Sequence, residues 1–526
     1  MYPELSSILL LTIPIIFLFM SACSTAQQTG SGAWRLNLSY LIVLLFIGAM
    51  LCKFASPSLD TAAHYISQSN LSMVMLALVI FMSVILIAFS GNYMAGEPHH
   101  QRYWFWLFNT LAAVSFVVMS NHLILFWLGW VSISLALHKL LMFYPHRPRA
   151  VLAAHKKFLL ARTAELSLLA AIGLLYLQQG TFFISEIVHH FTLVANDETA
   201  QLTTLDHIAA MLIALTALIK CAQLPIHGWL IQVVEAPTPV SALLHAGVIN
   251  LGGFLLILFA PLFIQSAVAQ WFVILVAGFT TVMAALIMTT RISVKVRLAW
   301  STSAQMGLML LECALGLFEL ALLHLLAHSV YKAYAFLHSG NAVFEDIHAR
   351  LAPAALPKFT DWLLAAGFCT TLVSMALWVM DYQGVLSVWI LLILALTMLV
   401  AQRLSQQPCS RVMPVLLLTI SLVVSYSLFK GIFSMLLPQL PALKAAPFSL
   451  VDIAATVLFF SLFTINLILL YQPHKPIVQR LYIALFAGLY LDEWLTRLTL
   501  KLWPIRLPPQ RNSKVLRLTP ISQVEE

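Results

Sequence analysis

The chain has 526 residues, of which 61% are hydrophobic and 9% are charged, against roughly 25% charged residues in an average soluble domain. Apolar runs of about 17 to 25 residues, long enough to cross a bilayer, follow one another from Ile8 to Leu470. The formal net charge is +8, but the basic residues cluster between apolar runs and therefore indicate topology, not nucleic-acid binding. The composition predicts an all-α, polytopic transmembrane helical bundle without a separate soluble domain.

The first apolar run ends in Ser21-Ala22-Cys23, which resembles the cleavage site of a lipoprotein signal peptide. The preceding segment MYPELSS contains no lysine or arginine, so we interpret residues 5–22 as the first transmembrane helix. The six cysteines stand singly without zinc-like spacing and are interpreted as core residues. No motif for a cofactor is evident.

Hydropathy and helix breakers predict about fifteen transmembrane helices, in an expected range of about 13 to 16. They are placed at residues 5–22, 36–52, 71–90, 103–119, 122–142, 158–177, 207–224, 238–261, 268–290, 298–316, 319–338, 360–380, 386–402, 412–431 and 448–472. The following segment mixes aromatic and basic residues at helical spacing. It is predicted to lie along the interface or to form one more short span.

Four basic segments are separated by even numbers of predicted helices, so they lie on one side of the membrane. These segments are residues 138–157, 291–297, 403–411 and 474–480. Lysine and arginine concentrate in cytoplasmic loops. The N-terminus is therefore predicted outside and the C-terminus in the cytoplasm, with residues 176–206 as an external acidic loop.

Ionisable residues interrupt the apolar pattern at residues 218–256, LIKCAQLPIHGWLIQVVEAPTPVSALLHAGVINLGGFLL. Lys220 ends an apolar run, and a lysine inside the membrane normally faces the protein interior or a water-filled cavity. We interpret it as a group that exchanges protons. The alternative is a lysine at a helix end whose ammonium reaches the interface.

Three further ionisable residues and three prolines follow Lys220 in this stretch. They are His227, Glu235 and His245, with Pro225, Pro237 and Pro239. Irregular backbone at membrane depth is tolerated only where protein covers it or where it lines a hydrated cavity. A single histidine would be interpreted as a core residue, but the group as a whole favours a path along which protons move.

A second group, His324, His328 and Lys332, recurs every four residues and shares one helix face. Two histidines at this spacing can bind a metal, but the segment lacks the glutamate of an HExxH motif and an evident third ligand. A proton relay is favoured, and a structural polar stripe is the alternative.

Arg162 and Glu165 form an i, i+3 pair that is either structural or supports the same path. Glu312 and Asp381 are weaker candidates.

Residues 93–343 resemble the large antiporter-like membrane subunits of respiratory complex I, multisubunit cation/proton antiporters and membrane hydrogenases. The resemblance rests on YMAGEPHHQRYWFWLFNTLAAVSF, NHLILFWLGWVS, RISVKVRLAWSTSAQMGLMLL, HLLAHSVYKAYAFLHSGNAV and, most specifically, PTPVSALLHA with its upstream lysine. It implies inverted helix repeats with discontinuous helices and a chain of buried charges. It also implies N-terminal helices (1–102), an antiporter-like proton-channel core (103–402), and C-terminal helices with an amphipathic segment and short cytoplasmic tail (403–526).

The resemblance assigns Lys220 to the family's broken-helix lysine and His245 to the histidine of the next helix. It assigns His324, His328 and Lys332 to the second half-channel. One position departs from the respiratory members, in which a glutamate follows the Gly-Trp of the fifth helix, because Val131 follows Gly129-Trp130 here. The chain also ends soon after its last predicted spans, without a long lateral helix.

Both departures, with the segments NHLILFWLGWVSISLALHKLLMFY and LYLDEWLTRLTLKLWP, resemble the membrane subunit of the two-component, Dab-type inorganic carbon transporters of the bacterial inner membrane. This resemblance implies a large zinc-containing partner similar to β-carbonic anhydrase (DabA type) that hydrates CO2. It also implies a membrane subunit without its own catalytic centre that conducts protons, or another cation such as Na⁺. The alternatives are a proton-translocating subunit of a complex I-like, hydrogenase-type or antiporter complex, and a structural scaffold.

Overall fold

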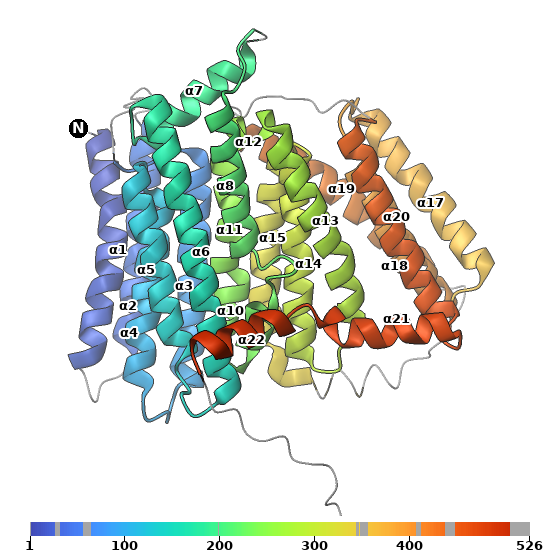
Figure 1. Cartoon of the computed structure of the whole chain (residues 1–526), viewed down its shortest axis with the longest axis horizontal. Coiled ribbons are helices and arrows are strands. Elements are labelled where there is room, and N and C mark those ends of the chain that lie inside the picture. Colours follow the sequence, from blue (N-terminus) through green and yellow to red (C-terminus); the bar gives the residue numbers. More distant parts are fainter. Residues whose placement is uncertain are drawn as a thin grey trace, which may run out of the picture.

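The computed structural model describes residues 2–26, 32–55, 65–197, 199–342, 344, 347, 356–406, 412–436 and 448–504. These residues form helices and no strand. The long helices stand side by side as a bundle, with the N-terminal helices at one edge and the C-terminal helices at the other (Figure 1). The predicted cytoplasmic tail lies outside the described residues.

Most long helices run the height of the bundle. They are α1 (Tyr2–Ala26), α2 (Ala33–Ala55), α3 (Asn70–Tyr93), α4 (His100–Met119), α5 (Leu123–Leu141), α6 (Pro148–Gln179), α8 (Thr204–Lys220), α13 (Ala267–Thr289), α14 (Val294–Ala314), α15 (Phe318–Leu337), α17 (Phe359–Val379), α18 (Ser387–Gln406), α19 (Val412–Leu436) and α20 (Leu450–Tyr471). Shorter helices connect or continue them. They are α7 (Ile184–Asn196), α9 (Gly228–Gln232), η1 (Val233–Glu235), α10 (Thr238–Ala246), η2 (Val248–Asn250), α11 (Leu251–Leu258), α12 (Ala260–Gln265), η3 (Ser339–Asn341), α21 (Pro476–Phe486), η5 (Gly488–Tyr490) and α22 (Glu493–Leu502).

The predicted fold class is confirmed. Twelve helical segments of the described chain are long and apolar enough to cross a membrane, counting α10 with α11 as one. Together with α4, α8 and α14 they account for all fifteen predicted spans. Cap residues fix several ends, because side chains or left-handed backbone satisfy the free main-chain groups of a helix terminus. Thr203 and Asp206 form a capping box at the start of α8, and Gly180 ends α6 with φ of 68°.

Two predicted loops are largely helical. The basic segment 138–157 contains the end of α5 and the first turns of α6, and only residues 142–147 connect them. Charge suggested a loop, but Lys156 and Lys157 are buried and bonded to partners from distant parts of the chain. The external acidic segment contains α7, whose Ile184, Ile187 and Phe191 are buried on one face. Helical periodicity of apolar residues was the signal that this assignment overlooked.

The segment after α20 does not form another span. Residues 476–502, which we call the lateral segment, comprise α21, η5 and α22. They run across the bundle, roughly perpendicular to the long helices and near the end opposite α7 (Figure 1). Leu495 and Thr499 of α22 are buried, whereas Glu493 and Arg497 form an exposed ion pair. The amphipathic pattern in the sequence therefore gives a helix that lies on the bundle.

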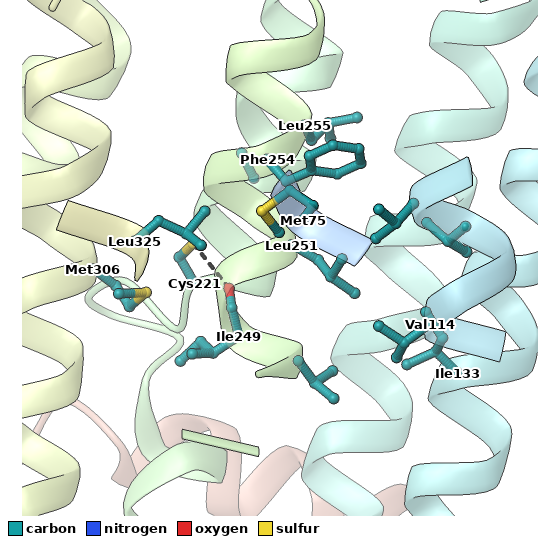
Figure 2. Packing of buried hydrophobic residues seen from close by; sticks show 14 of the residues in the cluster. Met75, Val114, Ile133, Cys221, Ile249, Leu251, Phe254, Leu255, Met306 and Leu325 are labelled. Carbon is teal, nitrogen blue, oxygen red and sulfur yellow. Dashed lines mark hydrogen bonds between the residues drawn. The ribbon is translucent and has the colours of Figure 1, made fainter. Parts of the chain in front are cut away.

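The predicted discontinuous helices occur at α8–α9 and α10–α11. Residues 221–227 separate α8 from α9, and their freed main-chain groups are satisfied by neighbouring helices, as burial requires. Thr280 of α13 accepts a hydrogen bond from the amide of Leu224, and Ser303 of α14 donates to the carbonyl of Ala222. Apolar side chains pack around this break, including Met306 and Leu325 near Cys221 (Figure 2).

The second interruption lies between α10 and α11. The side-chain amide of Asn250 donates to the carbonyl of Ala246 at 2.9 Å and to the hydroxyl of Ser329 on α15 at 2.6 Å. A polar side chain thus satisfies the interrupted helix and ties it to α15. Both irregular stretches are covered by protein, as irregular backbone in a membrane must be.

Candidate functional site

Lys220 is the last residue of α8 and lies directly before the break. Its side chain is buried, and its ammonium nitrogen lies 4.6 Å from the centre of the Trp130 ring on α5. Within the described residues this ammonium makes no hydrogen bond or ion pair. A cavity of about 20 Å³ adjoins it, which is room for one water molecule. An aromatic face and a small cavity replace the fixed carboxylate that a buried ammonium usually has.

A carboxylate group lies one helix away, on α6. Glu165 is buried, receives a hydrogen bond from the Ser134 hydroxyl, and pairs with Arg162 at 2.8 Å. It lies within electrostatic range of Lys220. Ser134 is one helical turn after Val131, the position at which the respiratory relatives carry their glutamate. The structure therefore places the Glu165 carboxylate, which comes from α6, near the position on α5 where the respiratory relatives carry their glutamate.

Lys157 lines the same small cavity as Lys220. It is buried and donates to the main-chain oxygen of Ser134 at 2.8 Å. Sequence reasoning assigned it to a basic loop and missed it. Two buried lysines, one on α6 and one on α8, therefore line the same cavity.

Three consecutive hydroxyl residues on α14 connect the first group to the second. Successive residues on a helix point about 100° apart, so neighbours on a buried helix reach different elements. Ser303 donates to Ala222 in the break, and Thr302 shares a hydrogen bond of 3.2 Å with Nδ1 of His245 on α10. Ser301 accepts from the ammonium of Lys332 on α15. Sequence reasoning overlooked this Ser-Thr-Ser run, although it lies in a segment that carried the family resemblance.

Lys332 is fully buried and also donates to the carbonyl of Leu298 at 2.9 Å. His328, one turn earlier on α15, has both ring nitrogens buried without a hydrogen-bond partner among the described residues. His245 stacks on Phe336 with ring centres 4.4 Å apart, and its Nε2 also has no partner in the part of the chain that the structure describes. These three ionisable residues lie within electrostatic range of one another. Unsatisfied buried ring nitrogens need an explanation, and proton exchange is one.

His324 continues the row to its far end. Its Nδ1 lies 3.0 Å from Glu312 of α14, and its Nε2 lies 2.9 Å from the side-chain oxygen of Gln305. Glu312, a weak candidate in the sequence, is the buried partner of this histidine. We call the set from α5 to α15 the buried polar row. Its members are Glu165, Arg162, Ser134, Lys157, Lys220, Ser303, Thr302, His245, Ser301, Lys332, His328, His324 and Glu312.

Two predicted residues lie off this row. His227 is buried at the other end of the break, with its ring 4.8 Å from that of Trp300. Glu235 ends η1 and is half-buried, and its main-chain oxygen accepts from Arg147. Among the described residues no hydrogen bond or ion pair joins its carboxylate to Lys220 or His245, so the structure does not bring it together with them. No group of three or more metal-binding side chains occurs among the described residues.

Comparison with known proteins places this arrangement in a class. Residues 120–356 match the family model "NADH:quinone oxidoreductase/Mrp antiporter, TM", and residues 64–104 match "NADH-Ubiquinone oxidoreductase (complex I), chain 5 N-terminus". A solved structure of the Mrp complex from Dietzia sp. DQ12-45-1b has a TM-score of 0.55 at 19% identity. That match covers 95% of this chain and 57% of the other, and shows a shared fold. These matches show that the chain contains the membrane domains of antiporter-type subunits.

Two relatives narrow the class. The chain is 46% identical over 511 residues to the probable inorganic carbon transporter subunit DabB of Hydrogenovibrio crunogenus, covering 97% of each. It is 34% identical over 514 residues to the probable inorganic carbon transporter subunit DabB2 of Halothiobacillus neapolitanus, covering 94% of this chain and 92% of the relative. The chain belongs to the DabB family of inorganic carbon transporter subunits, as the sequence resemblance predicted.

Proposed function

We propose that this chain conducts protons through the bacterial inner membrane and that their movement drives CO2 hydration in a partner subunit. The observation that carries the proposal is the buried polar row, in which ionisable side chains from α6, α8, α10 and α15 alternate with hydroxyl groups of α14. Buried ionisable groups at membrane depth are costly and are characteristic of ion pathways. The relatives are named as subunits of inorganic carbon transporters, which supports carbon uptake as the coupled process.

Lys220 is the proposed switching group. Its ammonium has an aromatic ring, a nearby carboxylate and a small cavity, but among the described residues no fixed hydrogen bond to break before it gives up a proton. Glu165 stabilises the charged form in place of the glutamate that is absent at position 131. The hydroxyls of α14 then connect the break to His245 and Lys332, because a hydroxyl both donates and accepts. Lys332 is the proposed second switch, with His328 and His324 as relays.

The proposed partner is a large zinc-containing subunit resembling β-carbonic anhydrase. The partner supplies the metal chemistry, and this chain supplies the ion gradient. Co-purification of the native complex with metal analysis tests this part. A large zinc protein supports it, whereas an iron–sulfur or quinone-reactive partner would make the chain a subunit of a complex I-like or hydrogenase-type assembly.

Proton movement is tested at Lys220. Reconstituted with its partner in liposomes, the Lys220→Met variant should lose proton flux, and cells carrying it should not grow at ambient CO2. Lys220→Arg should be nearly as damaging, because the guanidinium stays protonated at any accessible pH. Lys139, exposed in the last turn of α5, is the matched control, and Lys139→Met should retain flux. Full flux in Lys220→Arg at equal membrane levels would exclude Lys220 as the switch.

The proposed orientation places the N-terminus outside and the C-terminus in the cytoplasm. The basic segments and the lateral segment then face the cytoplasm, and α7 faces outward. A reporter fused after Glu526 should be active in the cytoplasm, and one inserted near Asp197 should be active outside. The reverse pattern would overturn the orientation while leaving the proposed path intact.

A further inference from the structure

A second and larger cavity lies between the break after α8 and the lateral segment. Its volume is about 260 Å³, enough for several water molecules. The polar residues that line it include His227, Gln232, Arg291, Trp300, Asp492 and Thr496. Of the residues predicted from sequence to carry protons, only His227 lies here. The proposed function therefore leaves this cavity unexplained.

The residues that line this cavity include donors and acceptors whose buried side-chain atoms have no hydrogen-bond partner among the described residues. In the described part of the chain, buried atoms without a hydrogen bond include Nε1 of Trp300 and Nε of Arg291, which donate, and Oε1 of Gln232 and Oδ1 of Asp492, which accept. Nδ1 of His227 is also unpaired. An anion would satisfy the donors and repel the carboxylate, and a cation would do the reverse. Water donates and accepts, so it satisfies both sets.

The lateral segment covers the cavity through a partly buried ion pair. Lys156 of α6 is fully buried and donates to Oδ2 of Asp492 and to the Thr496 hydroxyl, each at 2.6 Å. Gln232 of α9 donates to the same carboxylate oxygen at 2.9 Å. Asp492 therefore joins α6 and α9 to the lateral segment. An unpaired buried ammonium is unfavourable, so Lys156 favours the closed position of this segment.

Gly228 shows how closely α9 packs against Asp492 of the lateral segment. A Cβ atom at this position of α9 would lie 1.6 Å from Oδ1 of Asp492, closer than any real contact. Only glycine lets the carboxylate reach Lys156 past α9. Three elements that are distant in sequence, α6, α9 and the lateral segment, therefore fix the position of the Asp492 side chain.

The short helix α9 separates this cavity from the one beside Lys220. Trp229 lines the small cavity, whereas His227 and Gly228 line the large one. On α6, Lys157 faces the small cavity and its neighbour Lys156 bonds the carboxylate at the edge of the large one. The large cavity therefore lies across α9 from the cavity that Lys220 lines, on the side of the lateral segment.

We propose that this cavity is a water-filled vestibule through which protons reach the break after Lys220, and that the Lys156–Asp492 pair holds the lateral segment over it. The identity of the cargo rests on the proposed function, but the presence of water does not. Asp492 is a positioning residue in this proposal. It fixes the cover of the vestibule and does not itself belong to the buried polar row.

Cysteine labelling in membrane vesicles containing the whole complex tests the vestibule. Ile231 lines the cavity, and Val233, two residues further along, is buried away from it. A charged methanethiosulfonate reagent reacts with the thiolate, which forms in water and not in an apolar core. Ile231→Cys should be labelled at least about tenfold faster than Val233→Cys, each corrected for the parent chain. Equal, slow labelling at both positions would overturn the proposal.

A second variant tests the cover. In the Ile231→Cys chain, Asp492→Asn weakens the bond to Lys156 and should raise the labelling rate several-fold. Arg497→Gln removes the exposed pair with Glu493 on the same helix, at a residue that does not line the cavity, and is the matched control, which should leave the rate unchanged. An unchanged rate in Asp492→Asn would show that the pair does not hold the segment.

Labelling also separates this proposal from the proposed function, because it requires no flux. If Ile231→Cys is labelled fast but the chain conducts no protons, the proposed function is contradicted and the proposal of a hydrated cavity stands. Slow labelling in a chain that does conduct protons would overturn the vestibule alone. If protons use the vestibule, reagent bound at Ile231→Cys should also block flux, whereas reagent on the exposed surface should not.

Discussion

Two buried lysines, Lys220 and Lys332, occupy very different surroundings in one bundle. Lys220 ends a broken helix, faces an aromatic ring and a cavity, and has no fixed hydrogen bond among the described residues. Lys332 lies in the continuous helix α15, is fully buried, and donates to Leu298 and Ser301 of α14. The first has room to change its protonation with little loss of structure. The second is held by bonds that stabilise a single geometry.

The difference follows from the backbone. A broken helix exposes main-chain groups that neighbouring helices satisfy, and the irregular stretch leaves space for water beside the side chain at its end. A continuous helix satisfies its own main chain and leaves little space. Its lysine therefore takes partners from the next helix, and α14 offers a hydroxyl and a carbonyl. The proposed path joins a hydrated, loosely held site to a dry, tightly held one.

The largest expected effects are at the two lysines, which should differ in whether they tolerate a larger side chain. Lys332→Met should reduce proton flux by roughly a hundredfold, as Lys220→Met should, since proton-transfer groups contribute at least that much. Lys332→Arg, however, should also destabilise the protein by about 1–3 kcal/mol, because a larger group enters a filled site. Lys220→Arg should unfold like the parent, because a cavity adjoins it. Thermal unfolding in detergent, measured beside flux, checks both.

Equal stability of the two arginine variants would contradict the contrast between a tight and a loose site. Ser301→Ala is a milder variant of the same test, because it removes one of the two bonds to the Lys332 ammonium and leaves the lysine in place. Its flux should fall by less than that of Lys332→Met. No change in Ser301→Ala would show that the hydroxyl of α14 is not needed for the second switch.

A smaller effect is expected at the charge partner of Lys220. Glu165→Gln keeps the shape of the side chain but removes the charge near the ammonium, and should reduce proton flux by about tenfold, corresponding to about 1.4 kcal/mol. Adding Val131→Glu to this variant should restore part of the flux, because it returns a carboxylate to the position where the respiratory relatives have one. Asp197→Asn, at the exposed end of α7, is the control. Unchanged flux in Glu165→Gln would place the stabiliser elsewhere.

The bundle and the break after Lys220 could be predicted from sequence, because apolar length and proline carry their own physical signal. The interruption between α10 and α11 could not, because it lies inside the predicted span 238–261 and contains no proline. Lys220, His245, His324, His328 and Lys332 were predicted from charge inside apolar runs. Contacts that join distant elements carry no such signal. The pairing of Lys156 with Asp492 spans more than three hundred residues, so its lysine resembled an ordinary loop residue.

The hydroxyl run on α14 was missed for another reason. Serine and threonine are common on membrane helices, where they bond to their own backbone, and Thr302 also does this by donating to Leu298. Only the arrangement of α10, α15 and the break around α14 shows that three neighbouring hydroxyls reach three different elements. Glu235 shows the opposite limit of sequence reasoning. It is close to the break in sequence, but a charge at such a position need not face the break.

The smallest expected effect is one of stability and concerns two glycines. Gly228→Ala places a methyl group where Asp492 now lies, and the lateral segment must move. The variant should lose about 1–3 kcal/mol of unfolding free energy, as overpacked sites do. Gly173 of α6 has no atom within 4 Å of an added Cβ, so Gly173→Ala should be neutral or stabilising by up to about 1 kcal/mol. Limited proteolysis should release the lateral segment faster in Gly228→Ala only. Equal protease resistance in both variants would mean that α9 and the lateral segment are not in close contact, and that the loose surroundings of Lys220 do not depend on this cover.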